Sequence, residues 1–566
     1  MAQTARPPET TTMASTNEEP KQPPPETPQS LWLRRAVIAS FWAVVAFLGL
    51  PVWWRTTAIY RAELPLQDMM SWANAQVGTP VKAAFTPLTS TQECKLVFPL
   101  HIAVEAPLPS HDVHHLLEAT QNALNDLNSF PAHQLRLAFA EPPPPANASQ
   151  QVIVDGTGPA KEDDTAALSV RLIPVETGAT PRSRLQPYST NLDVYFSPNQ
   201  IPLQSSTSSP LATYIAGELH QLYAQEQAQL ANLISDASYR SRSASPDVAA
   251  QLQRQSARAF KYAPTYHLTF SLFTPTSTPS AWDIDAALRQ YMRPILESFS
   301  GISNFTIDTQ VQLYAGFSPS IRQPEYDDNA KAWTIYKEDV SGFINAAEWP
   351  LSPSIGQGPT INFALYVPDE GQAPLLVQGS RDNSWLIPQW GGVMILNPQS
   401  RDPTLTKEAL VPAMQVFSTQ LTSLLGLPQT PASLPLRIST LIRVHAASLI
   451  FSSSSTLGAL AQVYQKMPTI PVPDSVAKSV DLSLAHLNQA CESLREGRFQ
   501  DALENARTAN GEAEKAFFER SMVGQVYFPD EHKVAVYLPL LGPVAVPLVM
   551  AALKEVKAGI AALKGR

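Results

Sequence analysis

The chain has 566 residues, a formal net charge of −9, and 44% hydrophobic against 16% charged residues. This length exceeds what one hydrophobic core usually organises, so we expect one large or two intermingled folded units. The acidic balance, with no basic stripe carrying interleaved aromatic residues, excludes a nucleic-acid-binding protein, because phosphate binding calls for a basic surface.

A proline-rich tail precedes the first apolar segment. Residues 1–30 lack an apolar period and read as a disordered cytoplasmic tail. Residues 36–54 (AVIASFWAVVAFLGLPVWW) contain no charge and would span roughly 28 Å as a helix, close to the bilayer's hydrocarbon core of about 30 Å. They are too long for the apolar part of a signal peptide and end in tryptophans typical of a membrane interface. We therefore predict an uncleaved transmembrane helix.

Residues 55–406 mix strand and helix patterns. Runs rich in β-branched and aromatic residues predict strands, and residues 113–127, 211–234 and 282–298 have the apolar spacing of helices. We expect an α/β domain built as a mixed sheet with crossing helices. The predicted strands are residues 96–104, 136–140, 152–154, 167–175, 192–196, 266–273, 305–315, 361–367 and 393–396.

Two glycosylation triplets fall in this region. Asn147 begins Asn-Ala-Ser behind a run of prolines, and Asn304 begins Asn-Phe-Thr beside a predicted strand. Such triplets occur by chance, but both lie in the part of the chain that we assign to the lumen. We predict glycosylation at both, with the loop position of Asn147 the more favourable.

Strand patterns end near residue 407, and helix formers dominate from there to residue 533. Residues 475–494 and 500–518 flank a break that contains Gly497, which is typical of the end of a helix. The sequence therefore predicts a helical region, residues 407–533, that contains a helical hairpin and leads into a second anchor.

The second apolar segment, residues 534–553 (VAVYLPLLGPVAVPLVMAAL), also lacks charge and predicts a transmembrane helix. The tail at residues 554–566 is basic, so the positive-inside rule places it, and with two spans also the N-terminus, in the cytoplasm. Pro539, Pro543 and Pro547 recur every four residues and share one helix face, and each removes a backbone hydrogen bond. We predict a helix packed inside a multi-helix assembly, with an isolated kinked anchor as the alternative.

Cys491 and His445 partly match the sequence pattern of a cysteine-protease site. Gln489-Ala490-Cys491 matches the start of a caspase-type motif, and His445 lies upstream at a similar separation. The motif does not continue, and Cys491 falls in the middle of a predicted helix, where a thiol lacks the exposure that a nucleophile needs. We therefore predict no catalytic residue here.

His111, Asp112, His114 and His115 form the densest group of metal-ligand types. His111 and His115 would share a helix face, but no motif places a third ligand, so a solvated helix start is favoured. The acidic pairs at residues 163–164 and 327–328 are expected in solvated loops. We predict no metal and no cofactor site.

Only two cysteines occur, Cys94 and Cys491, which excludes a disulfide-rich scaffold. The alternatives are one long-range disulfide and two separate buried thiols. We favour the second, because cysteine is among the most buried residue types.

Three stretches resemble the PIG-S family: residues 49–65 (GLPVWWRTTAIYRAELP); residues 361–368 (INFALYVP) with residues 387–393 (IPQWGGV); and residues 516–518 with residues 527–539 (YFPDEHKVAVYLP). Residues 140–260 show no likeness that we can place. Within the second stretch, Trp390-Gly391-Gly392 reads as a tight turn with an aromatic ring on the sheet rather than as a binding site.

The resemblance implies a structural, non-catalytic subunit of the GPI transamidase complex of the endoplasmic reticulum membrane, with a large luminal domain. That complex joins preassembled GPI to the C-terminus of proproteins. The implied partners are membrane lipids and a PIG-K-like cysteine-protease catalytic subunit, PIG-T, PIG-U and GAA-type subunits. The alternative is a stand-alone, membrane-anchored hydrolase of the lumen.

Overall fold

The computed structural model describes residues 28–57, 60–75, 96–140, 166–176, 178, 180–202, 206, 209–234, 246–317, 322–336, 338–340, 358–380, 383–398, 402–468, 470–523 and 530–564. They fall into two compact units. The first comprises residues 1–61, 469–473 and 520–566, and the second comprises residues 62–468 and 474–519.

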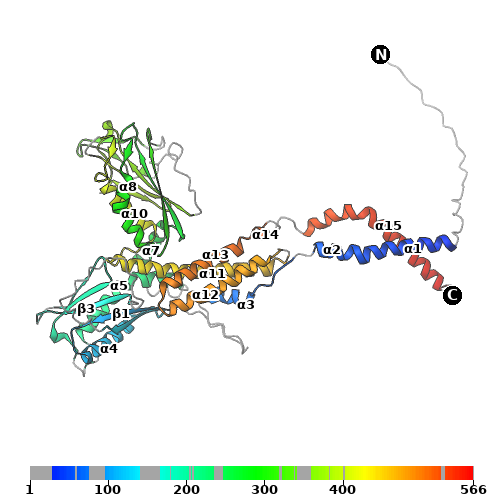
Figure 1. The fold of residues 1–566 in the computed structure, drawn as a ribbon, viewed down its shortest axis with the longest axis horizontal. Helices are drawn as coiled ribbons and strands as arrows, with labels where there is room; N and C mark the ends of the chain where they lie inside the picture. The colour runs from blue at the N-terminus through cyan, green and yellow to red at the C-terminus, as the bar shows by residue number, and fades with distance from the viewer. Residues whose placement is uncertain are drawn as a thin grey trace, which may run out of the picture. The chain divides into compact units, whose positions relative to one another are not determined.

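The first unit consists mainly of long helices (Figure 1). A continuous N-terminal helix contains α1 (Pro28–Val44), a π-helical turn η1 (Val45–Gly49) and α2 (Leu50–Thr57). The π turn lies directly before Pro51, whose ring would clash with a carbonyl of the preceding turn in a regular α-helix. In the π turn, the Leu50 N–H bonds to the Val45 carbonyl instead. The unit also contains α14 (Arg520–Val523) and α15 (Asp530–Lys564).

The N-terminal helix and α15 share an apolar surface and are joined by ion pairs. Large apolar side chains are exposed along both helices, including Phe47, Leu538 and Met550. Glu555 of α15 accepts hydrogen bonds from Arg34, at 2.6 Å, and from Arg35, at 2.9 Å, both of α1. The ion pairs thus join the segment before the first apolar stretch to the segment after the second.

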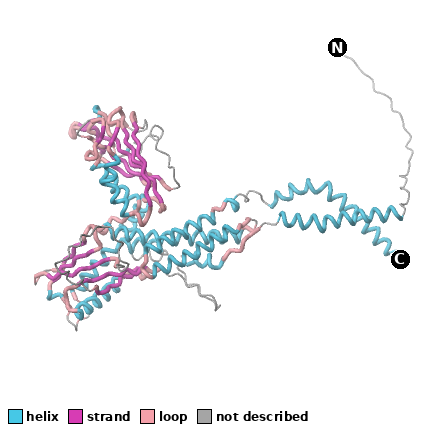
Figure 2. The backbone as a smooth tube through the Cα atoms, viewed as in Figure 1, coloured by secondary structure: helices cyan, strands magenta, loops and turns pink. Residues whose placement is uncertain are grey.

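The second unit contains a five-stranded sheet in the order β2-β1-β3-β5-β4. Figure 2 draws the strands of this unit in magenta. The first four strands are parallel, and β4 pairs antiparallel at one edge. Helix α4 packs against β2 and against α5. The elements are α3 (Leu66–Ala75), β1 (Phe98–Glu105), α4 (Ser110–Leu127), β2 (His133–Phe139), β3 (Leu168–Pro174), β4 (Arg182–Leu185), β5 (Asn191–Phe196), η2 (Pro198–Gln200) and α5 (Pro210–Ile234).

A second five-stranded sheet follows in the order β13-β14-β11-β6-β8, parallel except for β13. The rings of Phe270 and Phe363, on neighbouring strands, stack with their centroids 5.1 Å apart, and both contact Phe417 of α10. These three residues belong to the hydrophobic core between this sheet and α10. The elements are α7 (Pro246–Arg258), β6 (Thr265–Phe273), β7 (Ala281–Trp282), α8 (Ile284–Ala287), η3 (Leu288–Met292), α9 (Arg293–Ser298), β8 (Asn304–Gln312), β9 (Glu325–Asp327), β10 (Ala332–Ile335), β11 (Thr360–Tyr366), η5 (Glu370–Gln372), β12 (Leu375–Val377), β13 (Ser384–Ile387), β14 (Gly391–Ile395), β15 (Thr404–Leu405) and α10 (Val411–Leu424).

The mixed α/β character is confirmed, but the expectation of one mixed sheet is wrong. The strands form two separate five-stranded sheets and two small ones, β12-β10-β9 and β15-β7. Apolar alternation identifies a segment as a strand but does not identify the strands beside it. The helices α5 and α7 follow β5 in the chain and separate the strands of the first sheet from those of the second. The helix expected over residues 282–298 also begins later, at Ile284, and contains a π turn before Pro294.

Helices complete the second unit: α11 (Leu434–Lys466), α12 (Asp474–Arg495) and α13 (Phe499–Phe517) lie side by side (Figure 1). The predicted hairpin is α12 and α13, and Gly497 between them has a φ of 78°, which favours glycine at a helix end. By length and composition, Trp32–Val52 and α11 are each long and apolar enough to cross a membrane. In α11, 44% of the most apolar window is buried, against 0% for Trp32–Val52, and α11 packs against α3, α5, α12 and α13 of the second unit.

Candidate functional site

The two predicted glycosylation residues differ in what the structure shows. Asn147 lies outside the described residues. Asn304 is the exposed first residue of β8, an edge strand, and its backbone N–H bonds to the Pro264 carbonyl. Its sequon threonine, Thr306, contacts the imidazole of His267 through its hydroxyl.

The caspase-like pair does not form a nucleophilic site. Cys491 is buried in α12 and disulfide-bonded, so the preference for two free thiols is wrong for Cys491; Cys94 lies outside the described residues. His445 belongs to α11, where its ring lies 5.0 Å from that of Tyr262. Burial lowers the pKa of His445 to about 4, so its imidazole is neutral at physiological pH.

The polar start of α4 is solvated. His111 is exposed, and its Nδ1 lies 3.7 Å from a carboxylate oxygen of Asp112. No group of three or more histidine, cysteine, aspartate or glutamate residues suited to a metal ion occurs in the part of the chain that the structure describes. Asp327 accepts a hydrogen bond from the backbone N–H of Asn329 in a turn, and residues 163–164 are outside the described ranges.

The turn predicted at Trp390 is confirmed. Trp390 N–H bonds to the Ile387 carbonyl, and its ring packs against a buried apolar cluster. A Cβ on Gly391, whose φ is 154°, would lie 1.8 Å from the Asn362 carbonyl oxygen, so only glycine fits there. The motif therefore has a packing role.

The three prolines of the predicted membrane-helix face, Pro539, Pro543 and Pro547, all lie inside α15, which continues through them. They are exposed, as are the apolar residues around them.

A buried ionic cluster that sequence reasoning missed lies between α5 and α11. Glu226 receives two hydrogen bonds of 2.6 Å from Arg443, and a third of 2.5 Å from the Thr440 hydroxyl. The Glu226 and Arg443 side chains are only 1% and 2% exposed. His133 of β2 lies 3.3 Å from the same carboxylate, so the cluster joins the first sheet to α5 and α11.

Electrostatics keep this pair ionised. Burial opposes the charge on Glu226, but the Arg443 charge and the hydrogen bonds from Arg443 and His133 outweigh burial and hold the pKa of Glu226 below its usual range. For Arg443, burial is likewise outweighed by Glu226, and the pKa is raised. A sequence signal existed: Leu219, Tyr223, Glu226 and Leu230 share the buried face of α5, and a carboxylate on such a face requires a buried partner.

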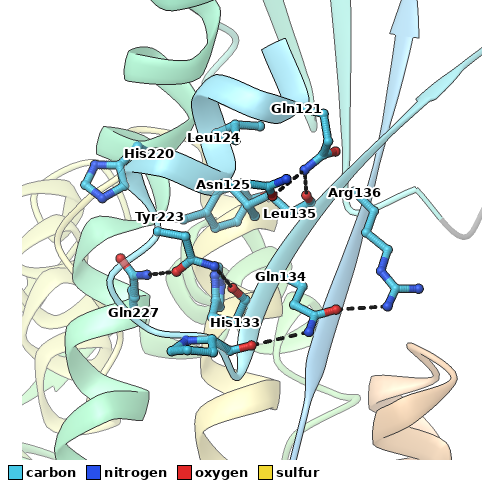
Figure 3. A pocket seen from close by; sticks show the side chains of 12 residues that line it. Gln121, Leu124, Asn125, His133, Gln134, Leu135, Arg136, His220, Tyr223 and Gln227 are labelled. Atoms are coloured by element: carbon cyan, nitrogen blue, oxygen red, sulfur yellow. Dashed lines mark hydrogen bonds between the residues drawn. The ribbon is translucent and has the colours of Figure 1, made fainter. Parts of the chain in front are cut away.

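A cavity of about 320 Å³ lies beside this cluster, between α4, α5 and β2 (Figure 3). Its polar residues bond to one another and to the edge of β2. Gln121 accepts from Leu137 N–H and donates to the Leu135 carbonyl, and Asn128 donates to the His133 carbonyl. The lining residues are Gln121, Leu124, Asn125, Asn128, Pro131, His133, Gln134, Leu135, Arg136, His220, Tyr223 and Gln227.

The chemistry of this lining is that of hydrogen-bonding recognition. It contains carboxamides, a phenol and imidazoles, and it has neither a carboxylate nor a cysteine. Its one permanently charged side chain, Arg136, is exposed and donates to Gln134. The cavity can therefore hold a neutral polar group.

Comparison with known proteins confirms the resemblance noted in the sequence. The profile of the PIG-S family, described as phosphatidylinositol-glycan biosynthesis class S protein, matches residues 40–562. The human GPI-anchor transamidase component PIGS is 27% identical over 552 residues, which cover 91% of this chain and 94% of the human one. The GPI transamidase component GPI17 of Saccharomyces cerevisiae is 25% identical over 542 residues, covering 91% and 90%. Because the family match extends over nearly the whole length, this chain belongs to the PIG-S family.

Proposed function

We propose that this chain is a component of the GPI-anchor transamidase of the endoplasmic reticulum membrane and supports attachment of preassembled GPI to the C-terminus of proproteins. The observation that carries the proposal is the match to the PIG-S family over residues 40–562. Relatives named as components of that transamidase, from mammals to yeasts, align with at least 91% of this chain.

Within the complex the role of this chain is structural and non-catalytic. The disulfide at Cys491 supports this, because a disulfide sulfur is not the thiolate that a cysteine nucleophile requires. The partners are then the remaining transamidase subunits: a PIG-K-like cysteine-protease subunit that supplies catalysis, together with PIG-T, PIG-U and GAA-type subunits. A stand-alone hydrolase is less well supported by relatives that are named as components.

The chain crosses the membrane twice, at residues 36–54 and 534–553, with both tails cytoplasmic. Exposed apolar side chains along both helices support this, because lipid rather than water would cover them. The ion pairs of Arg34 and Arg35 with Glu555 support it independently. These residues flank the outer ends of the two segments, and they meet only if both ends emerge on the same side.

The region between the spans is then luminal, with an α/β domain at residues 55–406 and a helical region at residues 407–533. Asn304 and Asn147 carry N-glycans. The exposure of Asn304 supports its modification. Pro539, Pro543 and Pro547 form a face that packs against other helices of the complex, since proline-freed carbonyls in lipid need neighbouring partners.

Affinity purification of the tagged full-length chain in mild detergent, with partners identified by mass, tests the proposal. We expect the other transamidase subunits to co-purify. Deleting the chain should remove GPI-anchored proteins from the cell surface and disperse those subunits. Recovery of the chain alone, together with hydrolase activity of the purified protein, would overturn the proposal in favour of a stand-alone enzyme.

A further inference from the structure

The strand β8 forms one edge of the second five-stranded sheet, and this edge is long and open. It extends over nine residues, Asn304–Gln312, and within the described part of the chain only β6 pairs with it. The other edges of the two large sheets are protected. The strands β4 and β13 are each four residues long, and the side chains of Gln121 and Asn128 occupy backbone groups of β2. Short length and side-chain cover both keep a sheet edge from pairing, and among the described residues β8 has neither.

The outward backbone groups of β8 belong to every second residue. The Asn304 N–H bonds to the Pro264 carbonyl, so the even-numbered residues turn their backbone groups toward β6. The N–H and C=O groups that point away from the sheet are therefore those of Phe305, Ile307, Thr309 and Val311. No described residue bonds to these groups. Such a row of unpaired groups is a template for one more strand.

The two faces of β8 differ in polarity. Ile307 and Val311 lie beside Leu268 and Leu272 of β6, which belong to the hydrophobic core between this sheet and α10. Ile307 is 39% exposed and Val311 is 37% exposed, so both extend the apolar face of the sheet beyond its covered part. A further strand with apolar residues on this face would continue the same core.

Asp308 lies on the opposite, polar face and is the one charged residue of β8. It is exposed, and no described residue forms an ion pair with it. A lysine or arginine opposite Asp308 in an added strand would complement this charge. The same charge disfavours a second copy of this chain. Antiparallel pairing of two β8 strands over their full length would place two Asp308 side chains opposite each other, and like charges in that position are destabilising.

We propose that β8 is the docking site for an extended segment of another subunit of the transamidase complex, which adds to the sheet as a further strand. The segment alternates apolar residues, which pack against Ile307 and Val311, with polar residues that include a lysine or arginine beside Asp308. The inference rests on the proposed function for the identity of the partner. A permanent subunit fits better than a passing substrate, because a long open strand with exposed apolar side chains is prone to aggregate and needs lasting cover.

The N-glycan proposed at Asn304 is compatible with this docking. Side chains alternate between the two faces of a strand, so Asn304 shares the polar face with Thr306 and Asp308. A glycan on Asn304 would leave the sheet from the face opposite Ile307 and Val311. It would not follow the direction in which the outward backbone groups point.

Photo-cross-linking of the full-length chain in intact cells tests the proposal. A p-benzoyl-phenylalanine introduced at Thr309 reacts on irradiation with the segment beside β8, and mass spectrometry identifies the linked peptide. We expect a peptide of a transamidase subunit in which apolar and polar residues alternate and which contains a lysine or arginine. A peptide of this chain, a proprotein, or a subunit peptide without this alternation would overturn the proposal, as would the absence of any product.

A proline on the outward side of β8 tests the strand pairing itself. Thr309→Pro removes an outward N–H and leaves the hydrogen bonds with β6 in place, because the Thr309 N–H points away from β6. We expect recovery of the docked subunit to fall about tenfold, since one backbone hydrogen bond is lost and its partner is left unpaired. Thr309→Val keeps the N–H and is the matched control. Unchanged recovery in Thr309→Pro would contradict strand addition.

Charge reversal tests the same contact without altering the backbone. Asp308→Lys should leave the unfolding temperature unchanged, because Asp308 is exposed, and should lower recovery of the docked subunit about two- to tenfold. Asp328→Lys, at an exposed turn residue of the same unit, is the control and should have no effect. Equal recovery with Asp308→Lys and Asp328→Lys would contradict the predicted basic residue.

These measurements separate the inference from the proposed function. If the subunits co-purify with the chain and nothing cross-links at Thr309, the docking site fails alone. If no subunit co-purifies, the proposed function fails. Cross-linking takes place in the cell before purification, so a subunit peptide linked to Thr309 would still establish the docking.

Discussion

Arg443 of α11 meets the carboxylate of Glu226 of α5 through two parallel hydrogen bonds of 2.6 Å, across 217 residues of sequence. Both side chains are almost fully buried, so neither charge is hydrated, and the loss of water is compensated by the attraction between the two charges and by their hydrogen bonds. The geometry of the pair is completed by Thr440 and by the ring of Phe499, which lies 5.1 Å below the guanidinium.

Replacing one member of this pair should cost more than replacing both. Glu226→Gln leaves Arg443 buried without a counter-charge and should destabilise the fold by about 3–5 kcal/mol, whereas Glu226→Leu with Arg443→Met should cost less. Thermal unfolding of the full chain in detergent measures both. If the losses in stability of the two single variants simply added in the double variant, the coupling would be contradicted. Arg293→Met, which removes an exposed ion pair with Glu297, is the control and should change stability little.

As the pH falls from neutral, the loss of folding stability should come first from His445 rather than from Glu226. The folded pKa of Glu226 is depressed, so its contribution is complete above its unfolded pKa, near 4.3, and is lost only as the pH falls further. His445 behaves differently: its folded pKa is about 4 and its unfolded pKa about 6.5, so the unfolded chain binds the proton first as the pH falls.

Stability should therefore decrease between about pH 6.5 and pH 4 by up to ~1.4 kcal/mol per pH unit through His445. His445→Gln should flatten that part of the profile. Unfolding temperatures of the two proteins, measured across this range, give the difference curve. A difference independent of pH would show that His445 is not buried in its neutral form.

The elements that the sequence predicted are those governed by local pattern. The ends of α4, β11 and α13 lie within a few residues of the predicted ones, because apolar periodicity and Gly497 mark them. Strand order depends on pairing between segments tens of residues apart, and the partner of Glu226 lies 217 residues away; apolar periodicity encodes neither. The cavity was missed for the same reason: Tyr223 and Asn125 look like ordinary helix residues until α4 and α5 are brought together.

Charge reversal at Glu555 should separate the ends of the two long helices. Glu555→Lys would place a cation opposite Arg34 and Arg35 and break both ion pairs. Changing both arginines to glutamate in that background should restore attraction between the helix ends. Disulfide formation between cysteines placed one turn inward, at Ile38 and Ala551, reports the contact. Lys557→Glu, also a charge reversal on α15, is the control, and cross-linking that is insensitive to Glu555→Lys would contradict the prediction.

Gly458 of α11 should be required for the contact with α3. A Cβ at Gly458 would lie 2.4 Å from the Cβ of Ala73, so Gly458→Ala must push the helices apart. We expect a loss of about 1–3 kcal/mol from overpacking, larger than the gain of up to about 1 kcal/mol that alanine normally brings to a helix. The matched control is Gly217→Ala in α5, where nothing lies within 4 Å and the helix gain should appear alone. Because Ala73→Gly removes the opposing Cβ, adding it to Gly458→Ala should recover the stability, and thermal unfolding that shows no recovery would place the cost elsewhere than in this contact.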